Sequence, residues 1–212
     1  EMQALQAQMN PHFIFNCING IQYYVLANKM DQVLSYLSDF SKVIRESLSN
    51  ANRRMVTLNQ EIEFLKSYLH LEQMRFPDKF NYSIQCEKEN TISFVQIPPM
   101  LVQPFVENAI RHGFSNLMEK GQLSILFQPL SGDVLKCTIT DNGVGRKKTE
   151  VKLPNQMEDR LHSGKITETR LKLFNTAELP DKYKIVYTDL FSENGTSGLK
   201  VEIYLPIEIV QG

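Results

Sequence analysis

The sequence predicts an α+β protein in which an N-terminal helical hairpin precedes a layer of about five strands with three helices on one face. Two observations support this fold class. Up to about residue 50, apolar residues recur at spacings of three and four, the period of a helix. From residue 79 onward, alternating apolar and polar residues, typical of half-buried strands, are interleaved with helical segments. We therefore expect two domains, residues 1–54 and residues 55–212.

Two helices are expected in the first domain. The first has an apolar row at Ile14, Ile18, Ile21 and Val25, and the second has one at Val33, Leu37, Phe40, Ile44 and Leu48. The link at residues 28–31 is short, so the helices should form an antiparallel hairpin. Two helices alone bury too little apolar surface for a stable core, which predicts a homodimer that closes a four-helix bundle.

The second domain follows a polar linker at residues 50–54. Thr57 and Gln60 fit a capping box that opens a helix ending near Pro77. Further helices are expected at 98–113 and 169–177, and strands at 80–86, 123–127, 134–140, 183–190 and 199–205. Turns at 131–133 and 194–195 should join the last four strands as two antiparallel pairs.

Composition narrows the class of protein. The net charge of −1 over 212 residues argues against a nucleic-acid binder, which usually carries a basic stripe. Cys17, Cys86 and Cys137 have no paired spacing and suggest free thiols in a reducing compartment. No run of about 18 apolar residues and no signal peptide is visible. The chain opens with helical character and no cap, so we expect it to be part of a longer protein whose preceding helix continues upstream.

His12 is the first candidate for chemistry. It lies off the apolar row of the first helix and follows Pro11, which kinks a helix when it stands inside one. A neutral imidazole can act as a nucleophile or a base near pH 7. The alternative is an ordinary half-exposed histidine beside a helix break.

A second candidate is the helical segment at residues 104–113. Its apolar residues form one face, and Glu107, Asn108, Arg111 and His112 gather on the other. The amide oxygen of Asn108 can ligate Mg²⁺, and the planar donor fork of Arg111 can meet phosphate oxygens. The alternative is a solvated polar face.

Two glycine-containing loops complete the candidates. Asp141-Asn142-Gly143-Val144-Gly145 follows a strand, and Asp141 could accept a hydrogen bond from an exocyclic amine such as that of adenine. Gly164, in Ser163-Gly164-Lys165, precedes a helix and could expose amides to phosphate. Taken alone, an ordinary turn and a plain loop explain these two segments.

In this order the segments resemble the sensor histidine kinases of two-component signalling, of the LytS/YehU type. The resemblance covers essentially the whole chain. Its marks are P-H-F-I-F-N at 11–16, Arg75-Phe76, the run from Gln103 to Gly113, and D-N-G-V-G at 141–145.

The resemblance implies a phosphoacceptor hairpin followed by a GHKL-type α/β sandwich with a mixed five-stranded sheet and about three helices. It implies an ATP-dependent protein-histidine kinase in which His12 takes the γ-phosphoryl group of ATP and passes it to an aspartate on the receiver domain of a response regulator. Asn108 would hold Mg²⁺, Asp141 would read adenine, and Gly143 and Gly145 would shape the nucleotide loop. The remaining expected ATP-binding residues are Arg111, His112, Gly164 and Arg170. The chain would be the cytoplasmic portion of a bacterial inner-membrane sensor, attached to the membrane through an upstream region.

The sequence departs from the usual kinase pattern at two places. Phe13 follows His12 where many histidine kinases carry a carboxylate, so Glu107 is a candidate to take the proton or orient the ring. Asn16, one turn below His12, could orient the ring or place a water for dephosphorylation of the regulator, or be an ordinary helix-surface amide. Only Gly164 stands where two glycines are usual, and Leu199, with Thr196 as a substitute, follows Gly198 in place of a small hydroxyl residue. These gaps leave a non-catalytic dimerisation and nucleotide-sensing module that regulates a partner as the alternative hypothesis. An ATPase clamp is disfavoured because it needs no histidine hairpin.

Overall fold

The structure is a computed structural model that describes residues 11–87, 94–115, 117–130, 132–145, 164–191 and 197–209. For residues 11, 12 and 197 it describes the backbone. The predicted upstream helix, the turn at 194–195, Ser163 and Thr196 lie outside these ranges.

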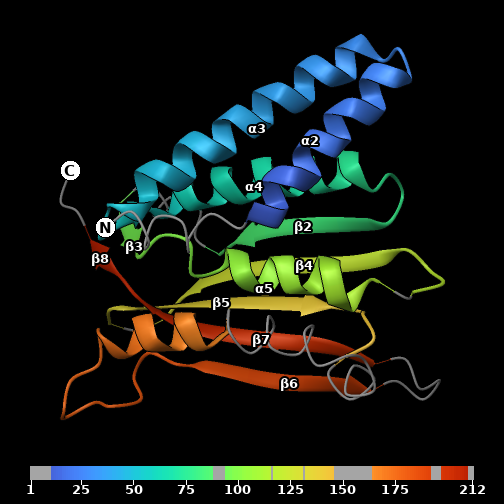
Figure 1. Cartoon of the computed structure of the whole chain (residues 1–212). Coiled ribbons are helices and arrows are strands. Elements are labelled where there is room, and N and C mark those ends of the chain that lie inside the picture. The colour runs from blue at the N-terminus through green and yellow to red at the C-terminus, as the bar shows by residue number, and fades with distance from the viewer. Residues whose placement is uncertain are drawn as a thin grey trace.

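Three long helices open the described chain. Helix α2 spans Pro11–Leu26, α3 spans Met30–Ala51 and α4 spans Leu58–Arg75. The link between α2 and α3 turns at Asn28, which has a φ of +52°. The two helices form the expected hairpin, and this hairpin lies across the outer side of α4 (Figure 1). The capping box at the start of α4 is confirmed, since the Thr57 hydroxyl accepts from the Gln60 amide and the Gln60 side chain accepts from the Thr57 amide.

The main sheet has five strands in the order β2-β4-β5-β7-β6. They are β2 (Phe80–Cys86), β4 (Gly121–Pro129), β5 (Val134–Asp141), β6 (Ile185–Phe191) and β7 (Ser197–Pro206). The β2–β4 pair is parallel and the other pairs are antiparallel, so the sheet is mixed. This agrees with the expected α+β fold class and sheet.

A second sheet of three short strands was not predicted. It contains β1 (Val56–Thr57), β3 (Val95–Ile97) and β8 (Glu208–Ile209), in the order β1-β3-β8. Strands of two or three residues are too short to show an alternating pattern, so the sequence gives no signal for them. Strand β3 pairs with β1, which follows α3, on one side and with β8, the last strand of the described chain, on the other.

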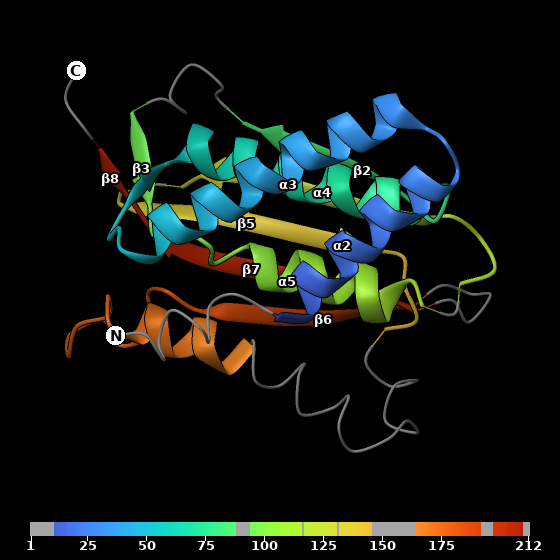
Figure 2. The ribbon, with the colours of Figure 1, turned by 45° about the horizontal axis from the view of Figure 1, so that its top comes forward.

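The helices α4 and α5 (Gln103–Asn108) and a helix at residues 164–172 cover one face of the main sheet (Figures 1 and 2). The core between them is built from fully buried apolar side chains such as Phe64, Val106, Ile125, Ile139 and Ile203. This is the predicted arrangement of three helices on one side.

Two helix boundaries were predicted wrongly. The segment expected as one helix from residue 98 turns at Pro99 and Met100, continues as α5, and ends as a π-helix, η2 (Ala109–Gly113). The last helix already includes residues 164–168, before the predicted start at 169, and ends at 172 instead of 177. Tertiary packing decides such ends, because the apolar pattern continues past the last helical hydrogen bond.

Candidate functional site

Helix α5 and the π-helix η2 form the first wall of the site. Pro104 stands in the first turn, where a missing backbone N–H costs nothing. The Phe114 amide donates to the Ala109 carbonyl at 3.0 Å, a bond from i+5 to i that widens the last turn. Such π-bulges occur frequently at functional sites.

The polar face of this wall carries the side chains expected from the sequence. Glu107 and Arg111 form an ion pair at 3.1 Å, and Asn108 and His112 are half-buried beside them. The guanidinium of Arg111 is therefore held by a carboxylate on its own helix in the protein without nucleotide. Its contact with phosphate stays a prediction.

The loop after β5 forms the second wall. Asp141 is buried at the end of the strand, and its Oδ1 accepts a hydrogen bond from the Gly143 amide at 2.8 Å. The Asn142 side-chain oxygen accepts from the Gln122 amide at 2.6 Å, and Gly145 has a φ of +67°. These hydrogen bonds give the loop a defined conformation, which fixes the Asp141 carboxylate at the end of β5, the central strand of the sheet.

The two walls meet at Gly113 and Gly143. A Cβ on Gly143 would lie 2.6 Å from the Gly113 Cα and 2.7 Å from Asp141 Oδ1. The Val144 amide also donates to the Gly113 carbonyl at 3.0 Å. The structure therefore brings two segments that were predicted separately into one site, with glycine required at the contact.

The sequence marks Gly198 as the glycine of the last strand pair, but its role in the site was not predicted. It lies on β7 beside β5, and a Cβ there would lie 2.2 Å from the Asp141 carbonyl oxygen. The glycine allows the two strands to approach where Asp141 leaves the sheet. Only the pairing of β5 with β7 could have revealed this role.

Two expected phosphate contacts lie at the helix of residues 164–172. Gly164 lies in this helix and is buried against Tyr187, whose hydroxyl would lie 3.0 Å from an added Cβ. The Arg170 guanidinium donates to the Pro99 carbonyl at 2.9 Å, so the arginine is engaged with the loop before α5. Lys172 on the same helix is exposed.

The hairpin brings His12 towards this site. His12 stands in the first turn of α2, and this turn lies beside α5 in both views (Figures 1 and 2). The neighbouring Phe13 ring packs on Tyr68 of α4, with 5.5 Å between ring centroids. Burial raises the pKa of Tyr68 well above its usual value, and the carboxylates of Glu72 and Glu107 add to the shift. Asn16 is half-buried one turn further along α2.

The hairpin packs on α4 mainly through residues that lie outside the two apolar rows predicted from the sequence. The buried residues are Cys17, Gly20 and Tyr24 of α2 and Val33, Tyr36, Val43 and Asn50 of α3. The Tyr24 hydroxyl donates to the Met74 carbonyl at 2.6 Å. Much of the predicted apolar row instead faces outward, because Ile18, Val25, Leu37 and Leu48 are exposed.

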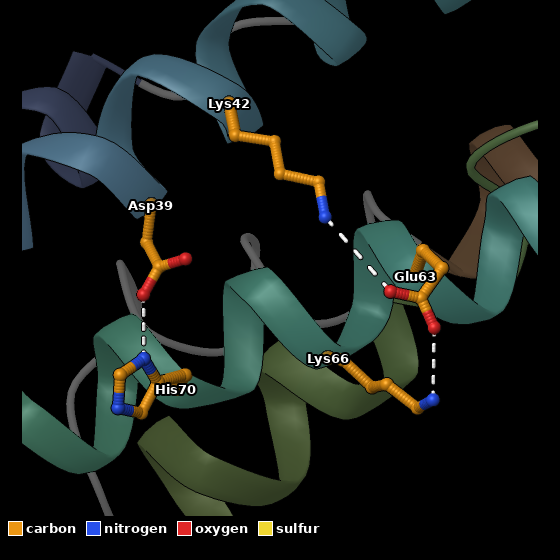
Figure 3. A network of polar contacts seen from close by, with 5 residues as sticks. All are labelled: Asp39, Lys42, Glu63, Lys66 and His70. Atoms are coloured by element: carbon orange, nitrogen blue, oxygen red, sulfur yellow. Dashed lines mark hydrogen bonds and ion pairs between the residues drawn. The ribbon is translucent and has the colours of Figure 1, made fainter. Parts of the chain in front are cut away.

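Polar contacts join α3 to α4 at the rim of this interface (Figure 3). Asp39 lies 2.5 Å from His70 Nδ1, and Glu63 accepts from Lys66 at 2.8 Å and lies 4.0 Å from Lys42. These groups are substantially exposed, so each pair contributes at most about 1 kcal/mol. The docking of the hairpin therefore depends mainly on its buried aromatic residues.

The described residues contain no group of three or more His, Cys, Asp or Glu side chains that could hold a metal ion. Asn108 offers one amide oxygen, which suits Mg²⁺ when phosphates and water supply its other ligands. All three cysteines are free, as expected. No helix in the described part of the chain is long and apolar enough to cross a membrane.

Two solved structures that share this fold are histidine kinases. The histidine kinase domain of the blue-light activated histidine kinase from Erythrobacter litoralis EL346 superposes with a TM-score of 0.52 at 15% identity, covering 95% of this chain and 91% of that one. The mycobacterial sensor histidine kinase MprB gives a TM-score of 0.50 at 12% identity, over 74% of this chain and 99% of that one. The fold is therefore that of the GHKL-type histidine kinase catalytic unit.

Sequence comparison identifies the family within this class. A histidine kinase family model matches residues 1–80. The sensor protein LytS of Staphylococcus haemolyticus is 36% identical over 157 residues, or 74% of this chain, and the sensor histidine kinase/phosphatase LytS of Staphylococcus aureus is 33% identical over 164 residues, or 77%. The chain belongs to the LytS-type sensor histidine kinases. It spans only 26% and 28% of the length of these two relatives.

Proposed function

We propose that the chain is the cytoplasmic kinase core of a bacterial two-component sensor, which phosphorylates His12 from Mg-ATP. The observation that carries the proposal is the contact of Gly113 with the Asp141–Gly145 loop, at the end of the helical segment whose first part, α5, lies beside the first turn of α2 (Figure 1). A nucleotide bound between these walls would have its phosphates on the side of the histidine helix.

Each wall has a separate task in this proposal. Asp141, buried and oriented by the Gly143 amide, accepts a hydrogen bond from the adenine amino group. Asn108 would hold Mg²⁺, which when bound would supply positive charge to stabilise the transferred phosphoryl group. Arg111 and His112 lie on the same helical surface and meet the phosphate oxygens.

The chemical step then needs little covalent help from the protein. A nitrogen of the His12 imidazole forms a bond to the γ-phosphorus, the bond from that phosphorus to the bridging oxygen breaks, and ADP leaves. Glu107 takes the proton of the imidazole, and Asn16 orients the ring. A carboxylate oxygen of an aspartate on the response regulator receiver domain later displaces the imidazole from phosphorus.

The exposed face of the hairpin supports a homodimer. Phe15 and Leu26 join the outward apolar residues of α2, and Leu34 joins those of α3. A contiguous apolar surface of this kind marks an interaction site. A second copy of the hairpin would cover it and close a four-helix bundle. The membrane attachment would come from an upstream sensor region of a longer protein; the LytS relatives are named as sensors.

Incubation with Mg²⁺ and γ-labelled ATP tests the proposal. We expect an acid-labile, alkali-stable label on the wild type that is lost in His12→Gln and Asn108→Asp. Asn81→Asp, an exposed change on β2, should keep it. Label retained in His12→Gln would contradict His12 as the acceptor. Absence of label from wild type that still binds an ATP analogue would favour the non-catalytic module, which the single glycine at 164 keeps as the second candidate.

A further inference from the structure

One peptide bond in the loop before α5 is held from both ends by charged side chains. The Arg170 guanidinium donates to the Pro99 carbonyl at 2.9 Å, and the Met100 amide donates to Glu61 Oε2 at 3.1 Å. Pro99 C=O and Met100 N–H belong to the same peptide unit. Two side chains from two helices, α4 and the helix at 164–172, therefore fix the orientation of this unit.

Glu61 is unusual because it is a carboxylate in the buried core between α4 and the loop before α5. It is fully buried, and its Oε1 has no hydrogen-bond partner among the described residues. A buried carboxylate is costly unless it is paired or hydrogen-bonded. Burial raises the pKa of Glu61 to about 7, and the Met100 amide and the positive charge of Arg170 oppose this rise. Packing alone would be served better by an apolar side chain, so the carboxylate has a specific partner in this peptide.

The held peptide needs support because of its backbone conformation. Met100 has a φ of +59°, which residues with a Cβ rarely adopt. Leu101 and Val102, both fully buried, follow it, and α5 begins at Gln103. The orientation of the Pro99–Met100 peptide therefore sets the direction in which the chain enters α5, the helix that ends at Asn108.

We propose that Glu61 and Arg170 are positioning residues that hold α5, and with it Asn108, in register with the helix at residues 164–172. This inference rests on the proposed function, since it assigns a purpose to the position of Asn108. It also gives the contact of Arg170 with the Pro99 carbonyl a purpose: the arginine joins the helix at residues 164–172 to the loop before α5, the helix that would carry the Mg²⁺ ligand.

The inference predicts that variants of Glu61 and Arg170 lose affinity for an ATP analogue only when Mg²⁺ is present. Asp141, which binds adenine in the proposed function, lies on β5, and the position of β5 does not depend on the Pro99–Met100 peptide. Asn108 lies on α5, which follows this peptide in the chain. Arg170→Gln and Glu61→Leu should therefore weaken the binding of a fluorescent ATP analogue in Mg²⁺ by about tenfold. In EDTA the same variants should bind the analogue as wild type does. A general loosening of the fold would weaken both.

Matched variants make the test specific. Glu61→Gln keeps an oxygen acceptor for the Met100 amide and should retain most of the Mg²⁺-dependent affinity. Glu63→Gln and Lys172→Gln change exposed charges on the same two helices and should behave as wild type. Because both residues hold one peptide, the double variant Glu61→Leu/Arg170→Gln should lose no more than the weaker-binding single variant. Thermal unfolding confirms that each variant is folded.

Several outcomes would overturn the inference. Wild-type affinity in Mg²⁺ for folded Arg170→Gln would do so, as would an equal loss in Mg²⁺ and EDTA, or additive losses in the double variant. These results leave the proposed function standing, provided that the wild type binds and transfers the label. Absence of analogue binding by the wild type would instead remove the proposed function together with this inference.

Discussion

At the scale of single residues, the site depends on glycines whose missing side chains allow two walls to touch. Gly143 has no room for a Cβ, because the Gly113 Cα and the Asp141 carboxylate would both lie closer than van der Waals contact allows. Separating the walls would move Asp141 relative to η2. A side chain at position 143 should therefore disrupt the nucleotide site before it unfolds the protein.

Replacing Gly143 by alanine tests this point. We expect Gly143→Ala to lower the free energy of unfolding by about 1–3 kcal/mol, as overpacking does, and to weaken ATP-analogue binding. Gly132→Asn is the control, since position 132 has a φ of +82° that asparagine tolerates and no atom within 4 Å of an added Cβ. Denaturant unfolding and analogue titration measure both effects. Equal affinity of Gly143→Ala and wild type would contradict the role of the contact.

Glu61 should make stability depend on pH. Burial raises its pKa from 4.5 to about 7, against the opposing effects of the Met100 amide and Arg170, while Glu46 adds to the rise. The folded protein thus holds the Glu61 proton more tightly than the unfolded chain does. The contribution of this group is fully present below pH 4.5 and is lost as the pH rises through about 7.

Glu61→Gln removes this titration. The melting temperature of the variant, relative to wild type, should rise as the pH is increased from 4.5 to above 7. Glu63→Gln should not show this trend, because the Lys66 ammonium lowers the pKa of Glu63. Melting curves across the pH range, measured by circular dichroism, give the answer. Parallel curves for Glu61→Gln and wild type would show that Glu61 does not titrate in this window.

At the scale of elements, the docking of α2 on α4 places the histidine helix beside α5. Phe13 contributes to this docking through its ring contact with Tyr68. Phe13→Ala should slow label incorporation on the order of tenfold, because the histidine next to it is less well placed. ATP affinity should stay unchanged, since Asp141 and Asn108 lie on other elements.

Asn19→Ala, an exposed change on the same helix, serves as the control for Phe13→Ala. Rates of phosphohistidine formation at saturating ATP, together with analogue binding, separate placement of the histidine from nucleotide affinity. An unchanged rate for Phe13→Ala would mean that phosphorylation does not use this docked arrangement.

At the scale of the whole molecule, the hairpin has two apolar faces and α4 covers one of them. Leu34 and Leu37 lie on the uncovered face of α3. If a second copy covers this face, Leu34→Glu/Leu37→Glu would bury charge in the dimer and should give a monomer. Sedimentation equilibrium should find twice the mass of one chain for wild type and for Gln32→Glu, an exposed control. A monomeric wild type would exclude the homodimer.

The main elements could be predicted because each has a local pattern. The alternation in β2, β4 and β5, the helical period of α3 and the Thr57 capping box all come from residues close together in the sequence. The small sheet of β1, β3 and β8 could not be predicted, since strands so short are defined only by hydrogen bonds to partners that are distant in the chain.

The residues of the candidate site likewise fall into those that could be predicted from the sequence and those that could not. Asn108, Asp141 and Gly143 could be singled out because the chemistry of a side chain, or its absence, is visible in the sequence. The role of Gly198 and the engagement of Arg170 with Pro99 could not, because both depend on elements that meet only after folding.

The sequence by itself thus determined the fold class, the hairpin, the family and the residue types of a nucleotide site. Only the tertiary structure decided which face of the hairpin is buried, which glycines touch, and that Glu61 and Arg170 hold one peptide between them. The physical reason is range: periodicity, capping and turn preferences act within a few residues, whereas the burial of a charge or the close approach of two backbones depends on residues that are far apart in sequence and meet only through packing.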